Sequence, residues 1–262
     1  MCPTYRTPLI SWYVPHIPAT SYQPAPHVGI EGLSPHTSYC IAHTKHMLRE
    51  GYWYGLPPLL ISGGLFGFWL RERSPFLLVC AIFFLVLAFL LLNFFRNPER
   101  PIPTQAQAII SPADGRIVQV VQESYEGRPV RRVSIFMSPL DVHVNRAPIA
   151  GIVREVSYRK GAFRVALREA ASVENEQNVF TLEGEQGQIV VKQIAGILAR
   201  RIVFWKRAGD SLARGERVGL IKFGSRVDVL MEPDVALTIK VGDHVRAGSS
   251  ILGTSHTKSQ IQ

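Results

Sequence analysis

An uncharged apolar run from Phe76 to Phe95 limits what this chain can fold into more than any other part of its sequence. The run has about twenty residues, which as a helix suffices to cross the hydrocarbon core of a bilayer. A shorter apolar run, Leu56 to Leu70, contains two prolines and three glycines, so we expect a weaker helix that is re-entrant or interfacial. Because only Arg71 to Pro75 separates the runs, the sequence predicts a hydrophobic helical hairpin that associates with a membrane. A hairpin buried in a soluble core is the alternative.

Positive charges flank both ends of the predicted hairpin, with Arg71 and Arg73 in its loop and Arg96 and Arg100 beyond it. Positively charged residues resist translocation, so this distribution assigns no clear orientation to the hairpin. A hairpin that enters one leaflet reconciles both ends. Whether the hairpin spans the bilayer or enters one leaflet stays open. We expect the chain at the cytoplasmic membrane, with the part after the hairpin on the cytoplasmic side.

The chain divides into three parts by composition. Residues 1–46 are rich in Pro, His, Tyr, Ser and Thr without a helix or strand period, and are predicted to be disordered. Met47 opens the sequence MLREGYWYG, which is typical of the start of a membrane-anchored protein, so we expect translation to begin there. Residues 47–103 hold the hairpin and a proline-rich linker, Phe94 to Pro103. Residues 104–262 form the remaining domain.

Short runs rich in Val and Ile, punctuated by Gly, Pro and Asp, follow from Ala108 onward. They predict a mostly β domain with a few helices, an α+β fold class. The residues Gly196–Val203 are ambiguous between strand and helix, and Ala166–Ala171 predicts a short helical turn. The expected strands are Gly115–Val121, Val130–Met137, Ile149–Tyr158, Asn178–Leu182, Ile189–Ile194, Arg217–Phe223, Val227–Leu230 and Val235–Lys240.

Two segments, SPADGRIVQV (Ser111–Val120) and KVGDHVRAGSSILG (Lys240–Gly253), resemble strands of the lipoyl and biotinyl carrier sandwich. The glycines of the second segment fit the turns of that likeness. We therefore expect lipoyl-like β-sandwich elements in this domain. A lipoyl carrier needs a protruding lysine in a hairpin, and no lysine has that context, so lipoylation is not expected.

Charge and cysteine content narrow the partners of the chain. The net charge is +9, and the residues from Arg96 to the end contribute +7 of it, with 24 Lys and Arg against 17 Asp and Glu. A basic domain beside an apolar anchor favours anionic lipid headgroups. Nucleic acid is not expected, because no long basic block or interleaved aromatic stripe accompanies the charge. No cysteine follows residue 95, so this domain lacks a disulfide framework and a zinc spacing, and we predict no metal.

Three polar residues lie in separate segments of this domain: Asp114 in a SPADG turn, His143 between two valines, and Ser225 after Gly224. Taken singly, each has a structural interpretation, as a turn former, a core histidine and a flexible break. Together they are an acid, an imidazole and a hydroxyl. Such a set activates a weak nucleophile, because the imidazole accepts the hydroxyl proton and the carboxylate orients the imidazole. The sequence alone does not bring the three together.

Several motifs, in order along the chain, resemble those of the phosphatidylserine decarboxylases in the short form found in prokaryotes. They are FFRNPER (94–100), SPADG (111–115), MSPLDVHVNRAP (137–148), ENEQN (174–178), IAGILARRIV (194–203) and GLIKFGSRVDV (219–229). The resemblance runs from about Met47 to the C-terminal region. Longer members of the family have Gly-Ser-Thr at the cut where this chain has Gly-Ser-Arg, and a second histidine where it has Arg146. Either His143 covers what two histidines share elsewhere, or Arg146 has a different role.

The resemblance implies an enzyme, a carboxy-lyase that converts phosphatidylserine into phosphatidylethanolamine and CO2, with residues 104–262 as its catalytic domain. It implies that Ser225 attacks the Gly224 carbonyl, with His143 as base and Asp114 as the orienter of the imidazole. The products of this self-cleavage would be a β chain, 1–224, and an α chain, 225–262, that begins with a pyruvoyl cofactor made from Ser225. The pyruvoyl group forms a Schiff base with the substrate amine, and His143 returns a proton after CO2 leaves.

The resemblance also suggests partners. The expected ones are phosphatidylserine in an anionic membrane and the two chains of one precursor, with a homo-oligomer left open. Candidates for binding the lipid phosphate or carboxylate are Arg146, Arg200, Arg201 and Lys222.

Two other functions remain open on the same residues. One is a membrane-anchored serine hydrolase that uses Asp114, His143 and Ser225, although the chain lacks a GxSxG elbow. The other is a non-enzymatic, lipoyl-like membrane adaptor.

Overall fold

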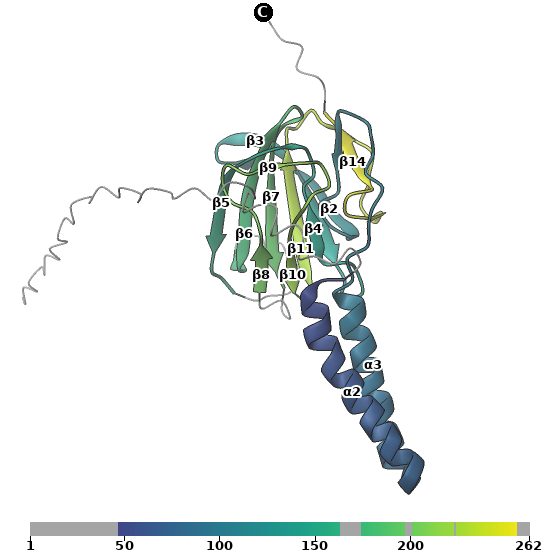
Figure 1. Cartoon of the computed structure of the whole chain (residues 1–262). Coiled ribbons are helices and arrows are strands. Elements are labelled where there is room, and N and C mark those ends of the chain that lie inside the picture. The colour runs from purple at the N-terminus through teal and green to yellow at the C-terminus, as the bar shows by residue number, and fades with distance from the viewer. Residues whose placement is uncertain (1–46, 163–173, 197–200, 223, 256–262) are drawn as a thin grey trace, which may run out of the picture.

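The computed structural model of the chain describes residues 47–162, 174–196, 201–222 and 224–255. Two long helices, α2 (Arg49–Glu72) and α3 (Pro75–Phe94), form a hairpin that projects from one end of a β domain (Figure 1). Helix α3 is long and apolar enough to cross a membrane. The predicted disordered extension, residues 1–46, lies outside the described residues, and a start of translation at Met47 stays a prediction.

Helix α2 is longer than the predicted apolar run Leu56 to Leu70, because it continues for 24 residues through both of its prolines. A Cβ added at Gly55 would collide with the side chain of Leu92 on α3. The Ser62 hydroxyl donates a hydrogen bond of 2.8 Å to the Ala81 carbonyl of α3. Close packing of small residues is how helices associate in lipid, and here it supports the segment whose prolines remove backbone hydrogen bonds. The buried residues of α2 are all small: Gly51, Gly55, Pro58 and Ser62.

The base of the hairpin packs into the β domain. Leu48 of the α2 entry and Phe94 and Phe95 at the end of α3 form one buried cluster with Val142, Val144 and Leu220. The Leu48 amide donates to the Phe95 carbonyl, which joins the two ends of the hairpin. The hairpin is therefore fixed to the strands that carry the His143 and Lys222 segments.

The β domain is built from one large sheet and two small ones. The large sheet has eight strands in the order β13-β2-β3-β11-β7-β6-β5-β9, and the small sheets have the orders β1-β14-β12 and β4-β10-β8. The strands are β1 (Ala108–Ile110), β2 (Gly115–Tyr125), β3 (Arg128–Met137), β4 (Val144–Arg146), β5 (Gly151–Arg159), β6 (Gln177–Gly184), β7 (Gly187–Ala195), β8 (Arg201–Phe204), β9 (Ser211–Leu212), β10 (Arg217–Lys222), β11 (Ser225–Met231), β12 (Ala236–Leu237), β13 (His244–Val245) and β14 (Ile251–Thr254).

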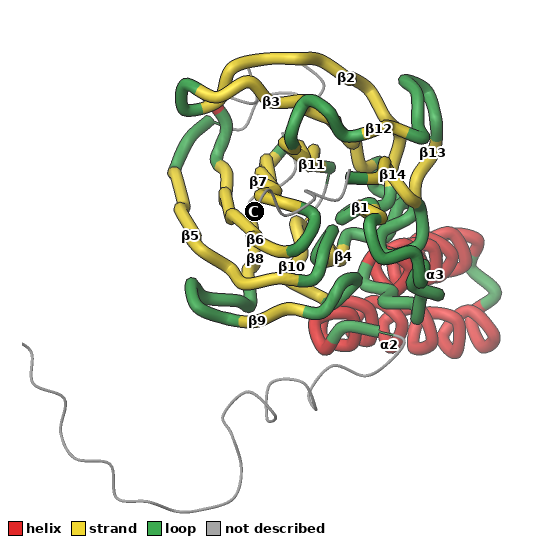
Figure 2. Tube along the Cα trace, turned by 90° about the horizontal axis from the view of Figure 1, so that it is seen from above, coloured by secondary structure: helices red, strands yellow, loops and turns green. Residues whose placement is uncertain are grey.

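The large sheet is strongly curled (Figure 2). One of its faces, with residues such as Ile135, Phe180 and Val227, packs against apolar side chains of the small sheets, for example Ile221 and Leu252. This contiguous apolar cluster is the main core, and burial of its surface is the chief stabilising force of the domain. We call this face of the large sheet the core face and the opposite one the outer face.

Strand β11 lies in the middle of the large sheet, antiparallel to β3 and β7. Its first residue, Ser225, is opposite Met137 of β3 and Ala195 of β7. The preceding strand, β10, belongs to a small sheet, so the chain changes sheets at Gly224, whose φ is +60°. A glycine suits this crossover because other residues rarely adopt a positive φ.

Most of the expected strands are confirmed, and the α+β class with them. The two lipoyl-like segments pair with each other through β13 and β2, and β14 of the second segment pairs with β1, which directly precedes the first. The expected strand Val235–Lys240 is wrong beyond Ala236–Leu237. The chain turns there instead, since the Lys240 amide donates to the Asp243 carboxylate at 2.9 Å. The ambiguous segment becomes strand β8 in its described part, and the turn predicted at Ala166–Ala171 lies outside the described residues.

Candidate active site

Ser225 begins strand β11 with its side chain on the core face, and it is fully buried. Its hydroxyl donates to the sulfur of Met137 at 3.4 Å, a weak acceptor. The scissile bond expected from the sequence, Gly224–Ser225, thus lies where the chain passes from β10 into the central strand. Because the Met137 sulfur is a weak acceptor, the Ser225 hydroxyl gives up little hydrogen-bond energy when it turns to another partner.

His143 lies directly before β4 and is also fully buried. Its Nδ1 is 2.9 Å from the Asp141 carbonyl oxygen, and its ring lies 4.2 Å from the ring of Phe94, the last residue of α3. The backbone carbonyl of His143 accepts from the Ile221 amide at 3.4 Å. The imidazole is therefore held between the end of helix α3 and strand β10, which leads to Gly224.

The contacts of His143 determine which nitrogen is basic. A carbonyl oxygen only accepts, so Nδ1 carries the hydrogen, and the lone pair is on Nε2. Nε2 is buried with no hydrogen-bond partner among the described residues. Burial lowers the pKa of His143 from 6.5 to about 4, partly opposed by its bond to the Asp141 carbonyl. The ring is therefore neutral at pH 7 with an uncommitted basic nitrogen.

Asp114 does not make the contact that the sequence predicted for it. One carboxylate oxygen accepts from the Arg100 guanidinium at 2.7 Å, and the other accepts from the Ala247 amide at 2.7 Å. Its pKa is raised by burial, opposed by the Ala247 hydrogen bond and by Arg100. The imidazole hydrogen bond expected from Asp114 goes to the Asp141 carbonyl instead. The short loop from Ser138 to Asp141, which folds back on the imidazole, places that carbonyl next to Nδ1.

The candidate substrate-binding cations fall into two groups. Arg146 is buried and donates to the backbone carbonyls of Gly215 and Pro98 at 2.9 and 3.0 Å, so it ties the linker to the domain. Burial lowers its pKa to about 10, which leaves it charged at pH 7. Lys222 and Arg201 lie side by side on β10 and β8. The Lys222 ammonium is 5.4 Å from the ring centre of Tyr54 at the base of α2. Arg200 lies outside the described residues.

Sequence reasoning assigned no role to a buried row of amides behind Ser225. Asn145 donates weakly to the Met137 sulfur at 3.8 Å and accepts from Gln193 at 2.8 Å. Gln193 accepts from Asn178 at 2.9 Å. Asn145 and Asn178 stand inside the motifs MSPLDVHVNRAP and ENEQN, but a motif letter does not say which side chain faces which. The alternation of strand residues was the available signal, because Gln193 interrupts the apolar alternation of β7 on its core face.

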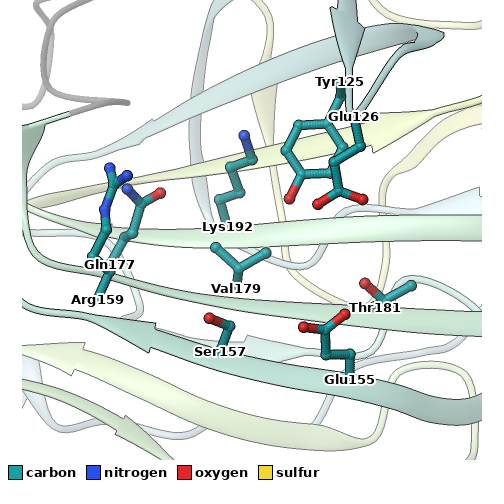
Figure 3. Close-up of a pocket in the computed structure, with 9 residues that line it drawn as sticks. All are labelled: Tyr125, Glu126, Glu155, Ser157, Arg159, Gln177, Val179, Thr181 and Lys192. Carbon is teal, nitrogen blue, oxygen red and sulfur yellow. The ribbon is translucent and has the colours of Figure 1, made fainter. Parts of the chain in front are cut away.

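A polar cavity of about 320 Å³ lies on the outer face, away from these residues (Figure 3). Lys192 and Tyr125 line it from one side, and Glu155 and Thr181 from another. None of the sequence-predicted site residues contributes to its wall. Lys192 pairs in register with Asp228 of β11, so the cavity continues the charged side of the central strand.

Comparisons with known proteins agree with the sequence motifs. The model of the family described as phosphatidylserine decarboxylase matches residues 87–253. A protein of Solibacter usitatus named phosphatidylserine decarboxylase proenzyme is 51% identical over 172 residues, which are 66% of this chain and 82% of the relative. A protein of the same name in Salinibacter ruber is 48% identical over 173 residues, which are 64% of this chain and 76% of the relative. Another, in Ralstonia nicotianae, is 42% identical over 207 residues, which are 78% of this chain and 93% of the relative.

Proposed function

This chain belongs to the phosphatidylserine decarboxylase family and is a decarboxylase, and from that premise we propose how it matures and acts. The precursor cuts itself between Gly224 and Ser225. The β chain, 1–224, and the α chain, 225–262, stay together, and Ser225 becomes a pyruvoyl group. The mature enzyme converts phosphatidylserine into phosphatidylethanolamine and CO2 at the cytoplasmic membrane.

The burial of Ser225 is the observation that carries this proposal. A fully buried hydroxyl has no access to an external acyl substrate, but it needs none to attack the carbonyl of its own preceding residue. This favours self-cleavage over the serine hydrolase that the same residues suggested. The positive φ of Gly224 supports it further, because a glycine adopts this conformation without strain and so permits the bent backbone that the attack needs.

His143 is the base that best fits this attack. Its Nε2 carries a buried, uncommitted lone pair, and its strand neighbours the segment that leads to Gly224. Nδ1–H is held by the Asp141 carbonyl, which fixes the ring and the tautomer as a carboxylate does in other sites. Asp114 has an indirect, structural role. It binds Arg100 of the linker and the Ala247 amide of the α-chain segment and so holds both in place.

The proposed cut balances as follows. The Ser225 oxygen forms a bond to the Gly224 carbonyl carbon while its proton passes to His143. The C–N bond then breaks, the nitrogen takes the proton, and an ester joins residues 224 and 225. Loss of the Cα proton expels the Gly224 carboxylate and leaves a double bond at residue 225. Water then replaces the nitrogen, which leaves as ammonia.

The residues around Ser225 fit a pyruvoyl group at that position. When present, the group supplies an electrophilic carbonyl that accepts electrons as CO2 leaves the substrate. The cut separates Gly224 from Ser225, which opens the buried position to the substrate amine. His143, with its pKa near 4, readily gives up a proton once it has accepted one, and so suits the return of a proton to the substrate carbon.

The place of the site relative to the hairpin explains how a lipid reaches it. Helix α3 ends at Phe94, whose ring contacts His143, so a bilayer around α3 brings headgroups to the level of the site. Lys222 and Arg201 are the cations best placed to meet the lipid phosphate, because both stand at the ends of strands beside the hairpin base. We do not propose Arg146 as a phosphate ligand, because its guanidinium donates to the backbone carbonyls of Gly215 and Pro98.

Intact mass spectrometry of the purified membrane protein tests the proposal. The wild type should give two chains that meet at residues 224 and 225, with the α chain lacking the serine nitrogen. Ser225→Ala should give one uncut chain without decarboxylase activity, with a mass of 29.2 kDa if it starts at Met1 and a lower mass if it starts at Met47. Active wild-type enzyme that stays a single chain with an intact serine would refute the pyruvoyl mechanism.

A further inference from the structure

We propose that Asn145 donates the hydrogen bond that stabilises the oxyanion on the Gly224 carbonyl during self-cleavage. Gln193 and Asn178 are positioning residues that hold its amide in the required direction. The inference rests on the self-cleavage proposed above and adds to it a group that stabilises the developing charge.

The first support is the direction of the Asn145 amide. Gln193 Nε2 donates to Asn145 Oδ1 at 2.8 Å, and Asn178 Nδ2 donates to Gln193 Oε1 at 2.9 Å. Each carbonyl in the row is therefore occupied by the next amide. Because Oδ1 is used, the NH2 group of Asn145 has to face the other way, toward Met137.

The second support is that this NH2 group has only poor partners. Its nitrogen is 3.8 Å from the Met137 sulfur and 3.5 Å from the Pro112 carbonyl oxygen, both at the limit of a hydrogen bond. The Ser225 hydroxyl rests on the same Met137 sulfur at 3.4 Å. The donor of Asn145 and the nucleophile thus meet on one atom, and neither is committed to a strong partner.

The third support is the setting. Ser225, Met137, Asn145 and Gln193 are fully buried, and Asn178 is 3% exposed. Burying amides in an apolar core has a cost that apolar residues of the same size would avoid. In the same low-dielectric surroundings, a fixed donor stabilises a developing negative charge strongly, because it needs no reorganisation.

The chemistry assigns each group one task. As the Ser225 oxygen bonds to the Gly224 carbon, the carbonyl electron pair moves onto its oxygen. His143 takes the hydroxyl proton, and the Asn145 amide donates to the new oxyanion. When the C–N bond breaks, the pair returns to the carbonyl, and Asn145 is released.

Asn145→Asp tests the donor, because it keeps the shape and removes both N–H groups. The precursor is made in a cell-free reaction with vesicles of phosphatidylglycerol and phosphatidylethanolamine, and its cutting is timed by intact mass. We expect cutting about 100-fold slower than in the wild type. The matched control is Asn97→Asp, another fully buried asparagine, which accepts from Arg217 away from the cut; it should cut at the wild-type rate.

Gln193→Met tests the positioning role, since it keeps the volume but frees the Asn145 amide to rotate. We expect cutting about 10-fold slower, with a lower melting temperature because the buried amides of Asn145 and Asn178 lose a partner. This variant stands in if Asn145→Asp does not fold. Treatment with hydroxylamine shows whether the ester intermediate accumulates, and so which step of the cut is slow. It cleaves the ester, so it should release no fragments from Asn145→Asp if the first step is the slow one.

Wild-type cutting by Asn145→Asp or Gln193→Met would overturn the inference, and so would hydroxylamine fragments, which place the defect after the ester. These outcomes leave the proposed function intact as long as the wild type cuts and Ser225→Ala does not. A wild type that never cuts would instead sink the proposed function itself.

Discussion

The two faces of strand β11 are both buried, yet they carry opposite kinds of polar group. On the core face, Ser225 lies among neutral partners: a sulfur and a row of amides. On the outer face, Arg226 and Asp228 form a fully buried, two-pronged ion pair at 2.6 and 3.0 Å. The polar groups on the core face of β11 thus include weakly bonded ones, whereas the charged groups on its outer face are paired with each other.

The outer face also explains a departure from the longer family members. Arg226, which stands where they have threonine, donates to Ser134 of β3 as well as to Asp228. Arg132 of β3 joins the same group through Ser134 and reaches Glu123 of β2 at 2.9 Å. This network ties the start of the proposed α chain to two strands of the proposed β chain. In the proposed function, the reacting groups lie on one face of β11, and the ion pairs that join the two chains lie on the other.

The largest effect is expected at His143, the proposed base for Ser225 on the core face. His143→Ala removes the proposed base, and we expect self-cleavage to slow by about 10² to 10⁴-fold. Intact mass over time measures the rate, and Ser225→Ala defines zero. Cutting at the wild-type rate would show that another group takes the serine proton.

On the outer face, Asp228→Asn leaves the Arg226 guanidinium buried without its anion. Removing one partner of a buried pair costs about 3–5 kcal/mol, so the free energy of unfolding should fall by that amount while cutting stays within a few-fold of wild type. Urea unfolding in detergent, in a Ser225→Ala background, measures it.

The double variant Arg226→Met/Asp228→Leu is the control, because replacing both charges by apolar groups is often close to neutral. If Asp228→Asn slowed cutting as much as His143→Ala does, the two faces would not have separate roles.

The burial of His143 should also make the stability of the protein depend on pH. The unfolded imidazole binds a proton near pH 6.5 and the folded one near 4, so the unfolded state holds more protons between these values. The stability is complete above pH 6.5 and is lost as the pH falls toward 4, by up to about 3 kcal/mol. Melting temperatures of Ser225→Ala with and without His143→Ala, at pH 7.5 and 4.5, isolate this contribution. An equal loss in both proteins would mean that His143 titrates normally.

The smallest expected effect is at the edge of the outer face. Lys192 lies 4.1 Å from the ring centre of Tyr125, a cation–π contact worth about 0.5–1 kcal/mol. Lys192→Met should lower the free energy of unfolding by no more than that and leave the cutting rate unchanged. A clear loss of decarboxylase activity in the cut Lys192→Met enzyme would assign the outer cavity a part in the reaction.

Much of the fold could be predicted from the sequence because it depends on local patterns. The apolar run that became α3 and the Val-rich segments that became β3, β7 and β11 follow from hydrophobicity and residue shape. The length of α2 could not be predicted in this way. Its prolines argue against a helix locally, and only the packing of small residues against α3 reverses that argument.

The contacts of the candidate site could not be predicted from its residue types. Ser225 and His143 are both fully buried, but Asp114 bonds to Arg100 and to the Ala247 amide rather than to the imidazole. A carboxylate near a histidine in sequence motifs suggests a pair, whereas the fold offered a backbone carbonyl that is nearer. Likewise Gln193 becomes visible as a partner of Asn145 only once β7 and β4 are placed in space.

The contact between the rings of Phe94 and His143 bears on how this protein should be handled. A laboratory that trims the hairpin to obtain a water-soluble enzyme would also strip away the hydrocarbon shield of the imidazole. Water would then reach the ring, its affinity for protons would climb back toward that of free histidine, and the shortened enzyme would report a different acid profile from the native one. Helix α3 thus contributes, through Phe94, to the surroundings of the proposed catalytic histidine.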